Sequence, residues 1–232
     1  MTEPRTDLDA AGVPDAPERV LIHPRNALAL AEAEANHRIA NNLSIVAAYL
    51  RLQASDVAAL GRLLTAENVG AILREAATRI ESVGKIHRHL AHTPTLRSVD
   101  ISGYFAELCS ELAATLAFNG AITFEGENGA CFVSQDRVVP LALCVLEAVT
   151  NAMKYAHPAG VAGRIAVACA VNDEDGIEVT VEDDGVGLPD GFDPRKDGGL
   201  GLRVMRSLVG QLGGEVAFES VGLGLTVRIT AP

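Results

Sequence analysis

Apolar residues recur at spacings of three and four along two long stretches in the first half of the chain. In the first stretch they form two neighbouring stripes, Ile39, Leu43, Val46 and Leu50 beside Ile45, Tyr49 and Leu52. In the second stretch they run from Val69 to Leu90. Because this period is that of an amphipathic helix, residues 23–93 are predicted to form a helical hairpin. One hairpin cannot bury stripes this wide, which favours pairing with a second copy into a dimeric four-helix bundle.

Shorter patterns fill the second half of the chain. The helical stretches are 102–116, 138–155 and 202–212, and the strand-like stretches are 122–125, 129–134, 165–171, 176–182, 215–220 and 225–230. The first two strands are expected to lie around a turn at Asn128-Gly129. Helices and strands interleaved in this way predict an α+β sandwich over residues 101–232, with a mixed, mainly antiparallel sheet and helices on one face. Residues 94–100 are predicted to be a linker, and residues 1–22 a disordered tail.

The first helical stretch also has a polar side. Opposite the apolar stripes lie His37, Asn41, Ser44 and Arg51, so the imidazole is expected to point toward water or a docking partner. An exposed histidine on a rigid helix can act as a nucleophile. Taken alone, it is more often an ordinary surface side chain.

Charge and composition exclude several classes of protein. A formal net charge of −11, without local basic clusters, argues against nucleic acid or an anionic membrane as the main partner. The first residues are polar and no apolar run reaches the length of a membrane span, so the expected location is the cytoplasm, without membrane insertion. The four cysteines, which lie far apart, are predicted to be reduced core residues: Cys109, Cys131, Cys144 and Cys169.

A polar face interrupts the most apolar helical stretch, 138–155. Glu147, Asn151 and Lys154 stand at positions i, i+4 and i+7, which places them on one side of the helix. A helix otherwise this apolar should direct that side toward something polar. Alone, the pattern would also fit a solvated edge.

Two glycine-containing segments follow this helix. Asp183-Asp-Gly185-Val-Gly187 comes directly after a predicted strand, which fixes a carboxylate beside a loop that can approach a ligand closely. Gly198-Gly199-Leu-Gly201-Leu202 then opens the next helix, and a glycine-rich turn at a helix N-terminus is a phosphate site. Each segment alone is inconclusive, but their order after the polar helix face, with His37 upstream, is specific.

With these motifs the chain resembles the sensor histidine kinases, from about Leu28 to Pro232. The stretch that carries the phosphoacceptor in one subfamily reads like His37-Arg38-Ile-Ala-Asn41-Asn42-Leu43. The second domain looks like the Bergerat-type ATP-binding fold that these kinases share with gyrase. The resemblance implies ATP and Mg²⁺ as cofactors, a homodimer, and the receiver domain of a response regulator as partner.

The resemblance also implies roles for single residues. Asn151 is the implied Mg²⁺ ligand, Glu147 assists the metal or the proton transfer, Lys154 contacts phosphate, and Asp183 accepts a hydrogen bond from the adenine amino group. The pocket and its lid, residues 188–200, are shaped by Gly185, Gly187, Gly199 and Gly201. Leu202 belongs to the same nucleotide-binding set, and Thr226 matches the last glycine box of the family more loosely.

His37 is the implied nucleophile toward the γ-phosphate. In the commonest family pattern an acid follows this histidine, whereas here Arg38 does. Glu34, one turn earlier, is therefore the candidate for the residue that orients the imidazole, and Glu34→Gln is expected to slow autophosphorylation.

The predicted function is that of a cytoplasmic histidine autokinase that passes its phosphoryl group to an aspartate of a response regulator. One alternative is a non-catalytic phosphotransfer adaptor, which the intact Asn151, Asp183 and glycine motifs disfavour. Another is a phosphatase of the response regulator with the same fold. The sequence does not reveal the input signal, the partner's identity, the balance of kinase and phosphatase activity, or transfer within or between chains.

Overall fold

The structure, a computed structural model, describes residues 24–59, 65–91, 98–115, 118–126, 130–158, 160–171, 176–220 and 223–232. The chain divides into two compact units, residues 1–36 and 37–232. The predicted tail, 1–22, and residues 94–97 of the predicted linker lie outside the described residues, whereas the last three linker residues, 98–100, form a short strand.

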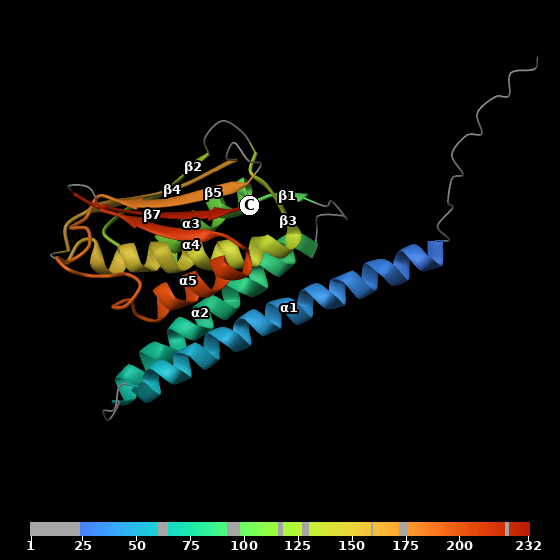
Figure 1. Cartoon of the computed structure of the whole chain (residues 1–232), viewed down its shortest axis with the longest axis horizontal. Coiled ribbons are helices and arrows are strands. Elements are labelled where there is room, and N and C mark those ends of the chain that lie inside the picture. Colours follow the sequence, from blue (N-terminus) through green and yellow to red (C-terminus); the bar gives the residue numbers. More distant parts are fainter. Residues whose placement is uncertain are drawn as a thin grey trace, which may run out of the picture. The chain divides into compact units, whose positions relative to one another are not determined.

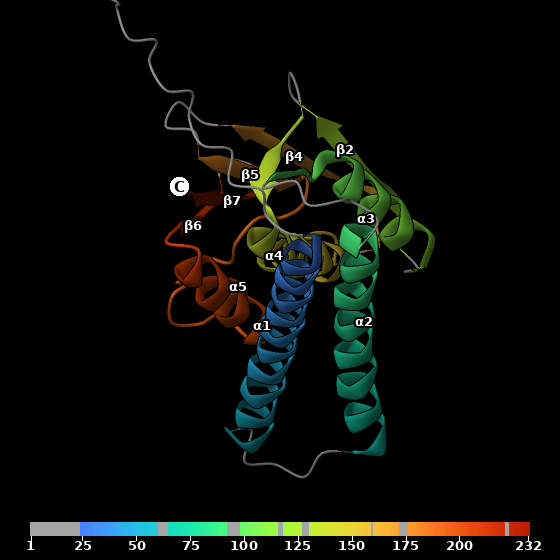
Figure 2. The ribbon, with the colours of Figure 1, turned by 90° about the vertical axis from the view of Figure 1, so that its right-hand side faces the viewer.

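Two long helices, α1 (Pro24–Ala59) and α2 (Ala66–Ala91), confirm the two helical stretches expected from the apolar stripes. From His37 on, α1 runs antiparallel to α2 (Figure 2). The inner positions of the stripes are buried, among them Tyr49, Val83 and Ile86. Other stripe positions stay open, since Leu43 and Leu73 are each 63% exposed. Part of the apolar surface of each of the two helices, α1 and α2, therefore stays uncovered in the described chain.

A five-stranded sheet forms the core of the second half. Its strands are β2 (Gly120–Gly126), β4 (Gly163–Val171), β5 (Ile177–Asp183), β7 (Leu225–Ala231) and β6 (Glu215–Glu219), in that order across the sheet. All neighbours are antiparallel except β2 and β4. The predicted mixed, mainly antiparallel sheet is therefore confirmed.

The pairing of the first strands differs from the expectation of two strands around a turn at Asn128-Gly129. β2 pairs with β4, and β3 (Phe132–Ser134) pairs instead with β1 (Ser98–Asp100). The turn residues themselves lie outside the described residues. A long helix stands between β2 and β4 in the sequence, and such a crossover brings the next strand back parallel to the first. The short-range turn signal therefore gave the wrong partner for β2.

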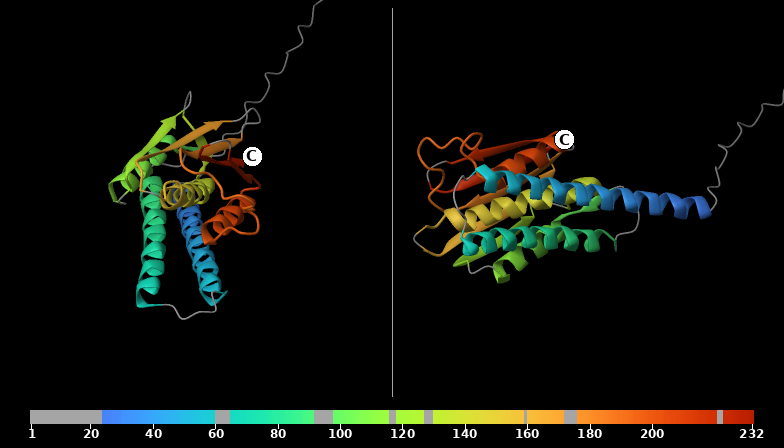
Figure 3. Two further views of the ribbon diagram at one scale, coloured as in Figure 1. Left: turned by 90° about the vertical axis from the view of Figure 1, so that its left-hand side faces the viewer. Right: turned by 90° about the horizontal axis from the view of Figure 1, so that it is seen from below.

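Three helices, α3 (Ser102–Thr115), α4 (Gln135–Tyr155) and α5 (Leu200–Gln211), cover one face of this sheet (Figures 1 and 3). Burial alternates along β4 and β5, as it does when one face of a strand is packed and the other is open. Ile165, Val167 and Val179 point into this core without exposed surface. The fold is thus the predicted α+β arrangement, with α4 at its centre.

Helix α4 is, among the described residues, the one helix long and apolar enough to cross a membrane by length and composition. However, 72% of its most apolar window is buried inside the fold. The core helix of a globular domain has the same properties, so the apolarity of α4 is explained by its place beneath the sheet.

The prediction of four reduced cysteines is wrong for two of them. Cys131 and Cys169 are joined by a disulfide, with their Cα atoms 6.4 Å apart. Cys109 and Cys144 are free and buried, and burial raises the pKa of both thiols. Spacing along the sequence could not reveal the pair, because β4 and the segment before β3 meet only through the fold.

Candidate functional site

A cavity of about 660 Å³ lies between the C-terminal part of α4, the loop after β5 and the start of α5, with α1 and α2 on its remaining side. Most of the residues singled out in the sequence line it: Glu147, Asn151, Lys154, Asp183, Gly187, Gly199, Gly201 and Leu202. The fold therefore brings three separate sequence motifs to one place. A cavity of this volume is within the usual range for a small-molecule site.

One end of the cavity is strongly polar. Glu147 and Asn151 lie one turn apart on α4, opposite the start of α5. At Gly201 the two helices approach so closely that a Cβ atom would lie 2.7 Å from Glu147 Oε2 and 3.4 Å from Asn151 Nδ2. The first turn of α5 has backbone N–H groups without helical partners, which favour an anion there. This end thus combines a carboxylate, an amide and a helix N-terminus.

The other end of the cavity contains a buried acid. Asp183 closes β5, is only 6% exposed, and accepts a hydrogen bond of 3.0 Å from the backbone N–H of Gly185. Burial raises the pKa of its carboxyl group, although backbone N–H donors oppose this. A carboxylate in such a place can accept a hydrogen bond from an amino group of a ligand.

Gly185 explains why the loop after β5 runs so close to α4. A Cβ atom at this position would overlap the backbone of Ala156, at the end of α4. The next residue, Val186, donates its N–H to the carbonyl oxygen of Ala156 at 2.9 Å. Gly185 does not line the cavity itself but lets the loop reach it.

The buried acid gives a pH-dependent prediction. Because the pKa of Asp183 is raised in the folded state, ionising it costs stability above the unfolded pKa, near pH 4, and costs nothing at lower pH. Asp183→Asn is therefore expected to raise the free energy of unfolding relative to the unsubstituted protein at pH 7, with a smaller difference at pH 4. Urea unfolding at both values measures this.

Asp184 provides the matched control, because the pKa of its carboxyl group is lowered where that of Asp183 is raised. The backbone N–H of Arg164 and the His157 ring lower the pKa of the Asp184 carboxyl group. Its ionised form therefore stabilises the fold above the unfolded pKa, and this is lost as the pH falls through the folded pKa. Asp184→Asn should lower stability more at pH 7 than at pH 4. If the two substitutions changed the free energy of unfolding equally, the directions given for both pKa shifts would be contradicted.

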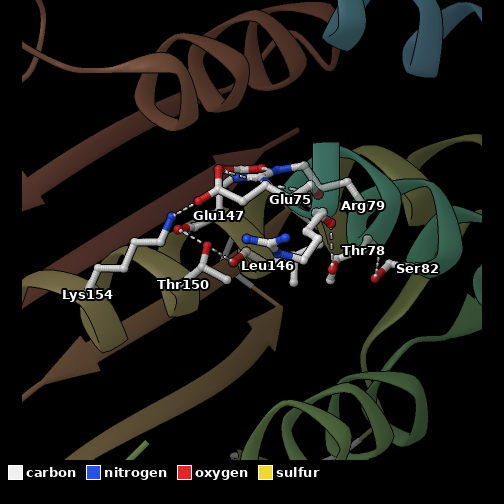
Figure 4. A network of polar contacts seen from close by, with 9 residues as sticks. Glu75, Thr78, Arg79, Ser82, Leu146, Glu147, Thr150 and Lys154 are labelled. Carbon is white, nitrogen blue, oxygen red and sulfur yellow. Dashed lines mark hydrogen bonds and ion pairs between the residues drawn. The ribbon is translucent and has the colours of Figure 1, made fainter. Parts of the chain in front are cut away.

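The sequence reasoning missed the cavity residues supplied by the helical hairpin. These are Gln53, Val57, Ile72, Glu75 and Arg79. Arg79 donates from Nε and Nη2 to the two carboxylate oxygens of Glu147, with 2.8 Å between Nη2 and Oε2, and Glu75 pairs with Lys154 (Figure 4). Burial works against the charge on Arg79, but the pairing with Glu147 outweighs it and raises the pKa of the guanidinium.

A sequence signal for Arg79 existed. It stands in the same helical register as the buried positions Ala76, Val83 and Ile86, where a charged residue is rare unless it is paired. A cation inside an apolar stripe therefore indicated an acidic partner elsewhere in the chain. Nothing in the sequence pattern indicated that the partner would be Glu147.

Two of the residues assigned to the site, Thr226 and His37, do not line the cavity. Thr226 stands between Leu225 and Val227, which line the cavity, so its side chain points to the opposite face of the sheet. His37 is exposed on α1 and does not line the cavity, and Asn41 Nδ2 lies 3.4 Å from its Nδ1. The side chain of Glu34 lies outside the described residues.

The segment predicted as a lid, 188–200, borders the cavity. Leu188, Pro189, Phe192 and Asp197 line it. The segment is held by its own hydrogen bonds and by Arg206 of α5, whose Nη1 donates to the carbonyl oxygen of Pro194 at 2.9 Å. These contacts attach the segment to α5.

Two family models match the chain. The model described as "Histidine kinase" matches residues 34–116, and the model described as "Histidine kinase-, DNA gyrase B-, and HSP90-like ATPase" matches residues 136–232. Together they include the His37 stretch and the whole cavity-lining part of α4, β5 and α5.

Individual relatives agree with these models. The chain is 28% identical to Blue-light-activated histidine kinase 2 of Erythrobacter litoralis, over 86% of this chain and 56% of that protein. It is 30% identical to Sensor histidine kinase PdtaS of Mycobacterium tuberculosis, over 76% of this chain and 34% of that protein. The chain thus spans between a third and just over half of the length of these two relatives.

Among solved structures, the Erythrobacter litoralis EL346 blue-light activated histidine kinase has a TM-score of 0.65 and 24% identity, covering 91% of this chain and 60% of that one. The separate kinase domain of the same protein has a TM-score of 0.59 and 20% identity, covering 82% of this chain and 95% of that one. At these identities the likeness concerns the fold.

Proposed function

Since the chain belongs to the histidine kinase family, we propose that it binds ATP with Mg²⁺ in the cavity and transfers the γ-phosphoryl group to His37. One observation supports this most: three separate motifs meet in a single cavity, with a buried acid at one end and an amide, a carboxylate and a helix N-terminus at the other. Phosphoryl transfer depends mainly on positioning and charge stabilisation, which these groups supply.

The two ends of the cavity suggest how the nucleotide lies. Asp183, buried beside Gly185, is suited to accept a hydrogen bond from the adenine amino group. Lys154 and the first turn of α5, near Gly199 and Gly201, are suited to the phosphates. The base would then lie beneath the loop after β5, and the triphosphate between α4 and α5.

The donor set at the phosphate end fits Mg²⁺. Asn151 would be the metal ligand and Glu147 would assist it, and both lie against Gly201. Among the described residues, no group of three or more acidic, histidine or cysteine side chains is placed to hold a metal ion. Mg²⁺ commonly takes only one or two protein ligands and completes its octahedron with water and substrate phosphates, so the pair is sufficient. When bound, the ion would neutralise charge on the phosphate oxygens.

His37 is proposed as the nucleophile because of its exposure and its contact with Asn41. With Nδ1 next to the Asn41 amide, Nε2 makes no hydrogen bond to any residue that the structure describes. Nε2 attacks phosphorus only in the tautomer that carries its proton on Nδ1, and in that tautomer the Asn41 amide presents its oxygen to Nδ1 as the acceptor. Glu34, one turn earlier on α1, remains the proposed orienting residue.

The proposed receiver of the phosphoryl group is an aspartate on the receiver domain of a response regulator, in the cytoplasm. The face of α1 around His37 carries small side chains, Ser44 and Ala47, which allow another protein to come close. The uncovered stripe residues Leu43 and Leu73 support pairing with a second copy through the hairpin, residues 23–93. Residues 101–232 would form the catalytic domain, after a linker over 94–100.

A titration tests the nucleotide part of this proposal. Binding of a non-hydrolysable ATP analogue, followed by calorimetry with and without Mg²⁺, is expected to saturate at one analogue per chain and to weaken when the metal is chelated. The affinity should lie in the range of about 1 μM to 1 mM usual for enzyme substrates. Absence of saturable binding would contradict the proposal and favour a phosphotransfer adaptor.

A further inference from the structure

The phosphate end of the cavity is engaged by side chains from α2. The guanidinium of Arg79 makes a two-point ion pair with Glu147, and Nη1 of Arg79 also donates to the carbonyl oxygen of Glu75 at 3.1 Å. The carboxylate of Glu75 pairs in turn with Lys154 (Figure 4). These two ion pairs, Arg79 with Glu147 and Glu75 with Lys154, are called the clasp below.

The two ion pairs of the clasp differ in burial and therefore in strength. Glu147 is 1% exposed and Arg79 is 8% exposed, and the Arg79 guanidinium also lies 5.0 Å from the centre of the Tyr49 ring on α1. Glu75 and Lys154 are both about half buried. Water screens the second pair but not the first. Arg79 therefore joins α2 to α4 through a buried ion pair and also contacts Tyr49 of α1.

The clasp uses residues that the proposed reaction needs. Glu147 and Lys154 face the cavity at the end where the triphosphate would lie, and here both are already paired with α2. While Arg79 holds the Glu147 carboxylate, Glu147 cannot assist a metal ion or a proton transfer. The same contact places a guanidinium and a carboxylate of α2 in the mouth of the cavity.

The clasped arrangement also keeps the cavity away from His37. Gln53, which lines the cavity, follows His37 on α1 by about four and a half helical turns, or about 24 Å. Phosphoryl transfer needs the attacking nitrogen within about 3.5 Å of phosphorus. A rigid helix cannot shorten this distance, so transfer to His37 of the same chain requires the α+β part to leave its place on α2.

We propose that the clasp is a resting-state lock, in which Arg79 and Glu75 hold the α+β part against the hairpin and must release Glu147 and Lys154 before His37 can be phosphorylated. This inference rests on the proposed function for the identity of the reaction, but the lock itself is a property of the nucleotide-free protein. It assigns to Arg79 and Glu75 a role in regulation that is opposed to nucleotide binding.

The charges of the clasp suggest what opens it. A buried ion pair separates only when both partners find new ones, since an unpaired buried charge is strongly unfavourable. A triphosphate with its metal carries charges of both signs at this end of the cavity, so nucleotide and clasp compete for Glu147 and Lys154. Removing the Arg79 charge should therefore make the nucleotide bind more tightly.

The test compares Arg79→Met with the unsubstituted full chain and with Arg74→Met, an exposed arginine on the same helix. Two quantities are measured: the affinity for a non-hydrolysable ATP analogue, and the amide hydrogen exchange of α2 in nucleotide-free protein. If the clasped state predominates by about ten to one, Arg79→Met should tighten analogue binding by about tenfold and speed α2 exchange. Arg74→Met should match the unsubstituted protein in both.

Unchanged affinity and exchange in Arg79→Met would overturn the lock. Weaker analogue binding with unchanged α2 exchange would overturn it as well, because Arg79 would then be a nucleotide contact. If Arg79→Met fails to fold, Glu75→Gln decides, since this half-exposed residue tolerates substitution and should shift both quantities in the same direction by a smaller factor. No shift in Glu75→Gln would then contradict the lock.

Failure of the lock and failure of the proposed function are distinguishable. If the unsubstituted protein neither binds the analogue nor labels His37, the proposed kinase function fails. The exchange of α2 in nucleotide-free Arg79→Met would still report on the lock.

Discussion

Replacing His37 with glutamine is expected to abolish incorporation of phosphate from γ-labelled ATP, by at least about 100-fold. Glutamine keeps the size and polarity of the side chain but has no nitrogen that can accept a phosphoryl group. Because His37 lies on α1 outside the cavity, nucleotide affinity should stay within about twofold. Filter binding of the labelled protein and calorimetry with an ATP analogue measure the two quantities.

Glu81→Gln is a suitable control for this substitution, because Glu81 is exposed on α2 and lies outside the cavity. It should label at the unsubstituted rate. Undiminished labelling of His37→Gln would place the phosphoacceptor elsewhere and contradict the assignment of α1.

Replacing Asn151 with alanine is expected to lower the labelling rate by about 100-fold or more, a typical effect of losing one group that stabilises transition-state charge. Alanine preserves the helix, so α4 should keep its place. The lower labelling rate should result from weaker Mg²⁺ binding, because Asn151 lies beside Glu147 and Gly201 at the phosphate end. Analogue binding in the presence of a chelator should change little, whereas its enhancement by Mg²⁺ should disappear.

Thr150→Ala provides the neighbouring control. The Thr150 hydroxyl bonds to backbone carbonyls of its own helix, at 2.7 Å from Leu146 O, and does not line the cavity. It should retain labelling and the Mg²⁺ effect. If Asn151→Ala kept its Mg²⁺ dependence, a different residue would have to be the metal ligand.

The elements and residues that were predicted correctly are those whose geometry depends on neighbouring residues in the chain. The period of α4 placed Glu147, Asn151 and Lys154 on one side, and the end of β5 placed Asp183 beside Gly185, in both cases because neighbours along the chain determine the geometry. The helix over 102–116 and the strands from β4 on followed from the same periods.

Contacts between distant segments could not be predicted in this way. The pairing of β2 with β4 instead of β3, the disulfide of Cys131 with Cys169, and the ion pair of Arg79 with Glu147 all join residues far apart in the chain. Arg79 is a partial exception, because the sequence shows a charged residue at a position of an apolar stripe. Thr226 shows the reverse case, since a motif resemblance suggested a pocket residue whose strand position turns it away.

The central claim, that ATP bound in the cavity phosphorylates His37, is tested most directly by locating the label. The unsubstituted protein is incubated with Mg²⁺ and γ-labelled ATP, the label is tested for stability in acid and base, and the modified peptide is identified by mass spectrometry at neutral pH. We predict an acid-labile, base-stable phosphate on the peptide that contains His37. An acid-stable phosphate on another residue, or no label although the nucleotide is bound, would contradict the claim.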